Sequence, residues 1–384
     1  MSESLGIFLF VVAILLVVVV HESGHFFFAK AFKIRVEEFF VGFGPRLWSF
    51  RRGETEYGVK ALPFGGYVRI AGMNPFQETP PEELPRTFGA KPIWQRAVVI
   101  AAGPLTHFVM AIVLFAVFFT AIGVQSRFVP AIDGVEATLG DQPSPAAVAG
   151  LQPGDRVIAV DGIAMVPNDD PEHAGDQFIE YTRAHVGQQI NITVQRDGAT
   201  LTVSATPVLA DVEGQQVGRL GVSLGTVSTA RDRTNPAVAF GRGVIETGRT
   251  VGEVVLQLGH VFGPAALKRV GLLLIGSTQR RDTDPTSIIG GARLAGQAAK
   301  AHAWDFFFGI LIIFNVFVGI LNLVPLPPLD GGHLAVLAYE KVRRRKPDVR
   351  KLVPLTVVVA GFIVLFALSV AVVDITNPLP SPFR

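Results

Sequence analysis

The stretch His21-Glu22-Ser23-Gly24-His25 lies within an apolar segment that runs from about residue 4 to residue 29. On a helix the two histidines are four residues apart, so both imidazoles project from one face and can bind one metal ion. Glu22 stands beside a histidine, where a carboxylate can accept a proton from a water that the metal polarises. Burying charged residues in an apolar helix costs about 2.5–3.5 kcal/mol each on insertion scales. The pattern therefore favours a metal site over a pair of histidines that only hydrogen-bond to neighbouring helices.

The composition limits the class of protein. Of the 384 residues, 49% are hydrophobic and only 17% are charged, which is too apolar for an ordinary soluble protein. The absence of cysteine excludes disulfides and thiolate ligands, so any metal must be held by nitrogen and oxygen. A net charge of +2 argues against a nucleic-acid-binding protein. The first apolar segment lacks a basic leader and a small-residue cleavage site, so we expect a retained helix.

The chain contains four apolar segments long enough to cross a membrane, at about 4–29, 98–124, 304–324 and 352–373. The loop at 30–97 contains eleven Lys/Arg against seven Asp/Glu, and a second basic run, at 341–351, suits contact with anionic membrane lipids. By the positive-inside rule both loops are cytoplasmic, which places both termini and residues 125–303 outside. The predicted fold class is a polytopic α-helical membrane protein with about four transmembrane helices.

Two stretches outside these segments are predicted to be ordered. Residues 36–73 contain short β-branched and aromatic runs separated by glycine-rich turns, which predicts a small membrane-associated antiparallel sheet. An edge of this sheet can accept an extended peptide, or the sheet only braces the metal-binding helix. Residues 236–262 are predicted to form an amphipathic helix that lies on the outer membrane surface or packs on the soluble part. The predicted domains are 1–124, 125–208, 209–303 and 304–384.

Residues 125–208 are predicted to form a compact β-rich unit. The run AGLQPGDRVIAVDG at 149–162 precedes a predicted helix at 176–185 and two strands, at 190–196 and 201–206. This order resembles a PDZ domain of the bacterial, circularly permuted kind. The resemblance implies that peptide termini or substrate ectodomains bind along an edge strand outside the membrane. A rigid spacer or size filter that binds nothing is the alternative.

The third apolar segment runs directly into NLVPLPPLDGGH at 322–333. Its three prolines must break the helix, which is tolerated in a membrane where the backbone is buried in protein or lines a cavity. The charge rule places Asp330 on the same side of the membrane as His21 and His25. Two imidazoles and one carboxylate leave a fourth position open, as in catalytic zinc sites.

A peptide must reach such a site as an unwound strand, because a helix hides its carbonyls in its own hydrogen bonds. The sheet at 36–73 and the broken segment around Asn322 are the expected clamps. His107, in the second apolar segment, is expected to be a hydrogen-bond partner and not a ligand. His107 and His333 are the candidates to lie beside the metal ligands.

Together these motifs resemble the bacterial site-2 proteases, the RseP-like intramembrane zinc metalloproteases. The resemblance rests on HESGH, GFGP, GGYVRIAGM, AAGP, one PDZ-like unit and NLVPLPPLDGGH in that order, over nearly the whole chain. It implies that zinc is bound by His21, His25 and Asp330. It also implies that Glu22 is the catalytic base. The turn that holds the substrate would contain Asn322, Pro325 and Pro327. The family commonly has Asn where this chain has His107.

The resemblance also implies a location and a class of substrate. The location is the bacterial cytoplasmic membrane, with the active site near the cytoplasmic face. The substrates are single-span membrane proteins already trimmed outside, such as anti-sigma factors, or remnant signal peptides, cut in regulated intramembrane proteolysis.

Three other classes agree with parts of the sequence. A different membrane zincin would need a glutamate as third ligand, and the apolar segments after the first contain none. A non-catalytic PDZ receptor or scaffold would not need Glu22. An ion transporter should show inverted repeats, and none is visible.

Overall fold

The computed structural model describes residues 1–73, 80–212, 215–281, 283–345 and 348–383. The chain divides into two compact units. One comprises Met1–Phe118 together with Asn235–Arg384, and the other is Phe119–Thr234. The second unit is therefore an insertion in the sequence of the first.

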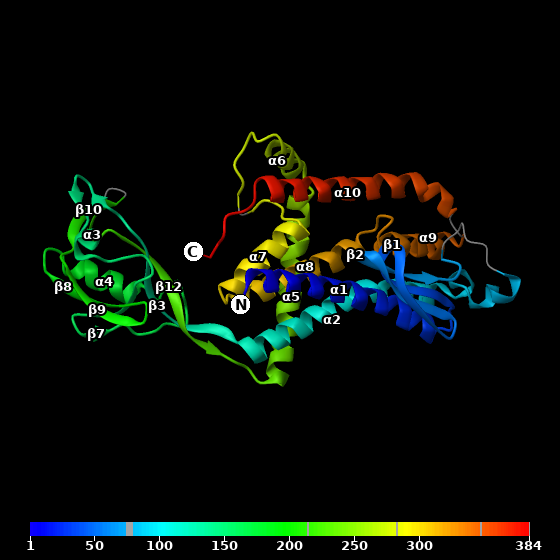
Figure 1. Cartoon of the computed structure of the whole chain (residues 1–384), viewed down its shortest axis with the longest axis horizontal. Coiled ribbons are helices and arrows are strands. Elements are labelled where there is room, and N and C mark those ends of the chain that lie inside the picture. Colours follow the sequence, from blue (N-terminus) through cyan, green and yellow to red (C-terminus); the bar gives the residue numbers. More distant parts are fainter. Residues whose placement is uncertain (74–79, 213–214, 282, 346–347, 384) are drawn as a thin grey trace. The chain divides into compact units, whose positions relative to one another are not determined.

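The first unit is mainly helical (Figure 1). Its helices are α1 (Glu3–Ala31), α2 (Ile93–Val117), α5 (Pro236–Val261), α6 (Pro264–Leu274), α7 (Ile288–Lys300), α8 (Trp304–Leu323), α9 (Asp330–Arg343) and α10 (Val353–Thr376). Among the described residues, four helical segments are long and apolar enough to cross a membrane: Glu3–Ala31, Ile93–Ile122, Trp304–Leu323 and Arg350–Thr376. The four predicted apolar segments are confirmed as helices of this length.

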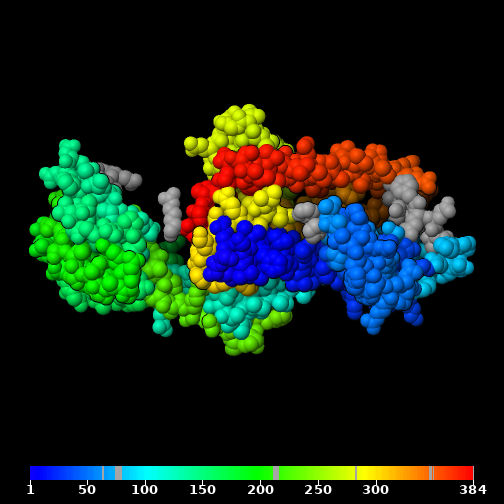
Figure 2. Space-filling model, in the orientation of Figure 1, coloured from blue at the N-terminus to red at the C-terminus, as the bar shows by residue number. Residues whose placement is uncertain are grey.

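Helices α1 and α10 expose large apolar side chains along their length. Phe8 and Leu16 of α1 are 61% and 57% exposed, and Val358 and Leu365 of α10 are 68% and 66% exposed. Figure 2 shows both helices at the surface of the helical unit. Soluble proteins rarely expose continuous apolar faces of this kind, so the two helices fit a lipid environment.

Helix α5 begins as predicted, because the Asn235 side chain accepts a hydrogen bond from the Val238 amide (3.0 Å) and Pro236 occupies the first turn. Within the helical unit α5 crosses α2 and α8 (Figure 1). Val254 of α5 is buried in one cluster with Ala111 of α2. Helix α5 thus packs on two of the long apolar helices, a contact that the sequence did not predict.

The sheet predicted after α1 is present, and its short runs belong to two long strands. Strands β1 (Val36–Arg52) and β2 (Thr55–Ile70) pair irregularly, with several register shifts. Gly42 and Gly44 in β1 have φ of +86° and +84°, which glycine adopts without strain. Because both strands bend, four short segments lie side by side, in the order 66–70, 36–41, 55–59, 48–52.

One buried core joins the sheet to α1, α2 and α9. It contains Ala29, Ile34, Val36, Ile70, Phe88, Val99, Ile100 and Leu337. Next to it α1 and α2 approach closely at Gly24, where an added Cβ would lie 2.6 Å from the Ala102 carbonyl oxygen. Glycine thus permits the contact that holds α1 against α2.

The inserted unit is built on a sheet with strand order β12-β3-β6-β8-β9. Its elements are β3 (Val124–Val135), β4 (Thr138–Leu139), β5 (Gln142–Pro143), α3 (Pro145–Ala149), β6 (Arg156–Val160), β7 (Ile163–Ala164), α4 (Asp176–Ala184), β8 (Ile190–Arg196), β9 (Ala199–Ala205), β10 (Val208–Val212), β11 (Gln215–Arg219) and β12 (Val222–Asp232). The helix and both strands predicted between residues 176 and 206 are confirmed as α4, β8 and β9. Phe178 of α4 packs in one core with Ile190 and Ile192 of β8.

The inserted unit is longer than the predicted 125–208. Strand β12 pairs with β3 along their whole lengths, from Val124 opposite Asp232 to Val135 opposite Val222. Gly221, whose φ is +82°, separates β11 from β12. The C-terminal boundary of the unit lies beyond residue 208 because β12, which follows residue 221, pairs with β3.

The Pro-Gly-Asp turn of the inserted unit is held by Asp155, which is fully buried. Arg196 donates two hydrogen bonds to its carboxylate, at 2.6 and 2.7 Å. Burial alone would raise the pKa of Asp155, but the bonds from Arg196 and from the Gln152 amide outweigh it, so the pKa lies below its ordinary value. The turn is thereby fixed to β8.

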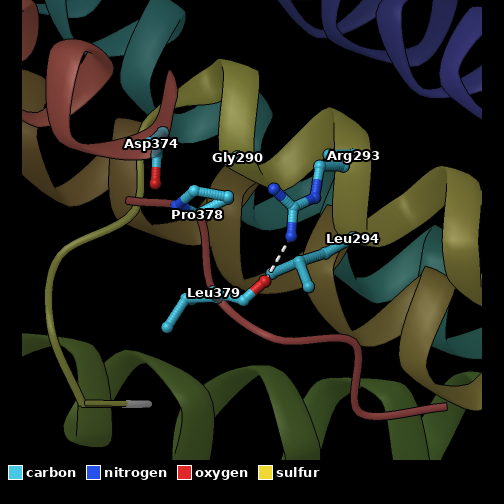
Figure 3. Close-up of a pocket in the computed structure, with 6 residues that line it drawn as sticks. All are labelled: Gly290, Arg293, Leu294, Asp374, Pro378 and Leu379. Atoms are coloured by element: carbon cyan, nitrogen blue, oxygen red, sulfur yellow. Dashed lines mark hydrogen bonds between the residues drawn. The ribbon is translucent and has the colours of Figure 1, made fainter. Parts of the chain in front are cut away.

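A small pocket beside α7 serves the fold. Figure 3 shows its lining residues, which are Gly290, Arg293, Leu294, Asp374, Pro378 and Leu379. Arg293 donates a hydrogen bond to the Leu379 carbonyl oxygen, and Asp374 accepts from Arg280 and from the Ser287 amide. Because these polar groups already hold α10 and the tail against α7, the pocket is not a candidate active site.

A bidentate ion pair joins α2 to α9. The Arg96 guanidinium donates to both carboxylate oxygens of Glu340, at 2.9 and 2.8 Å, and the two side chains are only 9% and 12% exposed. Removing one partner of a buried pair leaves the other charge uncompensated. The pair therefore fixes the position of α9, which begins at Asp330.

Glu340→Ala should lower the free energy of unfolding by about 3 kcal/mol, because it leaves Arg96 buried and unpaired. Glu246→Ala is the matched control, since its partner Arg249 is 68% exposed, and it should cost at most about 1 kcal/mol. Denaturant-induced unfolding in detergent measures both. Equal losses would show that the Arg96–Glu340 pair does not hold α9.

Candidate metal centre

Three predicted ligands meet at one point. His21 and His25 lie one turn apart on α1, with their Nε2 atoms 3.3 Å from each other. Asp330, the first residue of α9, places Oδ2 3.3 Å from each of these nitrogens. Among the described residues this is the group of His and acidic side chains arranged to hold a metal ion.

The donor set fits a tetrahedral zinc ion. Zinc bonds to nitrogen and oxygen of about 2.0–2.1 Å separate the ligand atoms of a tetrahedron by roughly 3.3 Å. Oδ2 of Asp330 is buried and accepts no hydrogen bond within the described part of the chain, so a cation is the partner that compensates it. Three protein ligands leave the fourth position open, as in catalytic sites.

Glycines make room for this arrangement. An added Cβ at Gly103 of α2 would collide with the His25 imidazole. Cβ atoms at Gly331 and Gly332 would collide with the backbone of Leu323 and of Pro327. The turn between α8 and α9 thus packs against the start of α9, and this contact sets the position of Asp330.

The two histidines are oriented by different partners. Nδ1 of His25 lies 2.8 Å from the Val99 carbonyl oxygen, a backbone group. Nδ1 of His21 lies 3.1 Å from Nε2 of His107, on α2. The structure therefore places His107 against the candidate ligand His21 and outside the group of three candidate ligands.

Glu22 faces the sheet. A Cβ added at Gly66 of β2 would lie 3.4 Å from the Glu22 Cγ atom. The Glu22 side chain thus packs against the segment of β2 at 66–70. This position is consistent with a base that works beside a bound peptide.

The remaining predicted residues surround the break after α8. Asn322 is half-buried in the last turn of α8, and Pro325 and Pro327 follow in the turn that leads to α9. His333 lies one turn beyond Asp330 on α9. In the described residues the side chains of Asn322 and His333 have no hydrogen-bond partner, so both remain available.

Sequence reasoning missed Asn315. This residue of α8 is fully buried, and its Oδ1 lies 2.9 Å from Nδ1 of His107. An amide in the middle of an apolar segment is costly unless it is hydrogen-bonded. The presence of a buried amide in this segment indicated a hydrogen bond, but the sequence could not identify His107 as its partner.

Comparison with known proteins identifies the family. The model of peptidase family M50 matches residues 9–368. The chain is 32% identical to zinc metalloprotease Rip1 of Mycobacterium tuberculosis, over 97% of this chain and 98% of that protein. It is 34% identical to Rip1 of Mycolicibacterium smegmatis, over 99% of both chains, and 31% identical to metalloprotease MmpA of Caulobacter vibrioides, over 88% of this chain and 86% of MmpA.

A solved structure is similar to a part of the chain. The PDZ domain of an SdrC-like protein from Listeria monocytogenes is 20% identical, with a TM-score of 0.20, over 27% of this chain and 93% of that domain. The family match and the Rip1 relatives each extend over nearly the full length. The chain belongs to peptidase family M50, the site-2 protease type of zinc metalloprotease.

Proposed function

We propose that this protease cuts single-span membrane proteins within the membrane, at a zinc ion held by His21, His25 and Asp330. The observation that carries the proposal is the set of three ligand atoms 3.3 Å apart, two of them on a helix of spanning length. Ionisable groups within a membrane-spanning helix cost free energy, so their presence indicates a functional site. A peptide bond hydrolysed there belongs to a segment that also lies in the membrane.

Glu22 is the proposed general base. When bound, zinc acts as a Lewis acid towards the scissile carbonyl and acidifies the attacking water. Glu22 follows His21 directly on α1 and faces the sheet, so its carboxylate can take the proton of that water and pass it to the leaving amine.

The purified protein should carry about one zinc ion per chain, as a single three-ligand site requires. His21→Ala, His25→Ala and Asp330→Ala each remove a ligand and should lose most of the zinc, measured by elemental analysis. His260→Ala, an exposed histidine of α5, is the control and should keep it. Full retention of zinc by Asp330→Ala would move the third ligand elsewhere.

The substrate is proposed to bind as an extended strand along β2. Residues 66–70 pair with 36–41 on one side and lie next to Glu22. A peptide added at the other edge would present its backbone to the base. Asn322, with its amide available, and the turn through Pro325 and Pro327 would hold the peptide from the α8 side.

Glu22→Gln should keep zinc but lose roughly 10²–10⁴-fold in activity, which is the usual contribution of a general base. The measurement is cleavage of a single-span model substrate in proteoliposomes, with zinc content determined in parallel. Glu246→Gln, at a partly exposed residue of α5, serves as the control. Activity within tenfold of the parent protein would exclude Glu22 as the base.

We place the protein in the bacterial cytoplasmic membrane, with both termini and the inserted unit outside. The support is the excess of Lys/Arg in the two loops between paired apolar helices, at 30–97 and 341–351. In this orientation the inserted unit, as a PDZ domain, meets the outer part of a substrate. If this unit is a size filter, the substrates that it would admit are anti-sigma factors and remnant signal peptides that are already trimmed outside.

The structure shows how to remove this unit cleanly. Ser126 of β3 pairs with Ala230 of β12, so residues 127–229 can be replaced by a short Gly-Ser linker without separating the strand ends. If the unit is a size filter, the deletion variant should cut a trimmed substrate and also a substrate with a bulky outer domain. The parent protein should cut only the trimmed one.

Gel-based cleavage assays with the two substrates distinguish the filter from a docking site. A required docking site predicts that the deletion variant cuts neither substrate. Loss of cleavage of the trimmed substrate, in a variant that is folded and zinc-loaded, would contradict the filter.

A further inference from the structure

A chain of buried hydrogen bonds leads from the metal centre into α8. Nδ1 of His21 lies 3.1 Å from Nε2 of His107, and Nδ1 of His107 lies 2.9 Å from Oδ1 of Asn315. The Asn315 Nδ2 amide returns to α2 and donates to the His107 carbonyl oxygen, at 2.7 Å. His107 is 1% exposed and Asn315 is fully buried, so water cannot replace either partner.

The direction of each hydrogen bond follows from the position of the ligands. Nε2 of His21 faces His25 and Asp330, so a bound metal takes its lone pair and the ring proton stays on Nδ1. Nδ1–H of His21 then donates to Nε2 of His107, which must be unprotonated. The His107 proton is therefore on Nδ1, and it donates to Oδ1 of Asn315.

The Asn315 amide agrees with this direction at both of its ends. Its NH₂ group can only donate, and it faces the His107 carbonyl oxygen, which can only accept. This bond turns Oδ1 towards the His107 ring. The amide thus selects the one neutral tautomer of His107 that leaves an acceptor for His21.

We propose that Asn315, acting through His107, is a positioning residue that holds His21 in the tautomer and orientation needed to bind zinc. The inference rests on the proposed ligand set. His25 needs no such support, because its Nδ1 bonds to a backbone carbonyl, that of Val99. The metal centre is thereby tied to α8, the helix that also leads into the turn before Asp330.

A purely steric role for His107 makes a different prediction. Its Cβ packs against Gly319 of α8, where an added Cβ would lie 2.7 Å away. If His107 and Asn315 only fill space between α2 and α8, any comparable packing defect in α8 should weaken the site equally. Val316→Ala, at a fully buried neighbour of Asn315 in the cluster with Ala111 and Ile312, is the matched packing defect.

The experiment measures the zinc dissociation constant of the purified full-length protein by chelator competition. Asn315→Leu removes the acceptor at similar volume and should weaken zinc binding by roughly 10–100-fold, the usual effect of losing a partner behind a metal ligand. Val316→Ala should stay within about threefold of the parent in the same measurement. The proposal would be overturned if Asn315→Leu weakened zinc binding no more than Val316→Ala does.

A second measurement uses the parent protein and does not depend on the folding of a variant. The chain has eight histidines, and ring-¹⁵N solid-state spectra of the zinc-loaded parent protein report which nitrogen of His107 carries the proton. A proton on Nδ1 supports the proposal, and a proton on Nε2 overturns it. Retention of zinc by His21→Ala would instead refute the ligand set itself, so the two failures are distinguishable.

Discussion

Two imidazoles and a carboxylate face one another inside a bundle of apolar helices, and the rest of the helical unit depends on compensating them. Unpaired, these groups would strongly destabilise the fold. A cation between Nε2 of His21, Nε2 of His25 and Oδ2 of Asp330 satisfies them at once, because the three atoms are already spaced as zinc requires. We therefore expect zinc binding and the folding of this region to be coupled.

The close spacing of the ligands depends on contacts that only small residues permit. Gly24 and Gly103 let α1 and α2 approach until the His25 ring lies over α2, and Gly331 and Gly332 let the start of α9 pack on the preceding turn. At its other end α9 is fixed to α2 by the Arg96–Glu340 pair. A shift of any of these contacts would move one ligand relative to the other two.

The inserted unit begins and ends on two strands that pair with each other. Its first and last strands, β3 and β12, pair from end to end, and the Thr234 amide donates to the Phe119 carbonyl oxygen at 3.0 Å. The chain therefore returns to the point where it left. The three candidate metal ligands all belong to the helical unit, and the inserted unit contributes none of them.

The sequence by itself determined the four apolar helices, the pairing of His21 with His25 on one helix face, and the strands and helix at the centre of the inserted unit. These follow from short-range patterns: i, i+4 spacing on a helix, runs of apolar residues, and alternation around turns. Only the tertiary structure decided which distant residues meet. The bends at Gly42 and Gly44, the pairing of β12 with β3, the crossing of α5 over α2 and α8, and the bond between Asn315 and His107 all join segments far apart in the chain. Their cause is packing between elements, which no local pattern specifies.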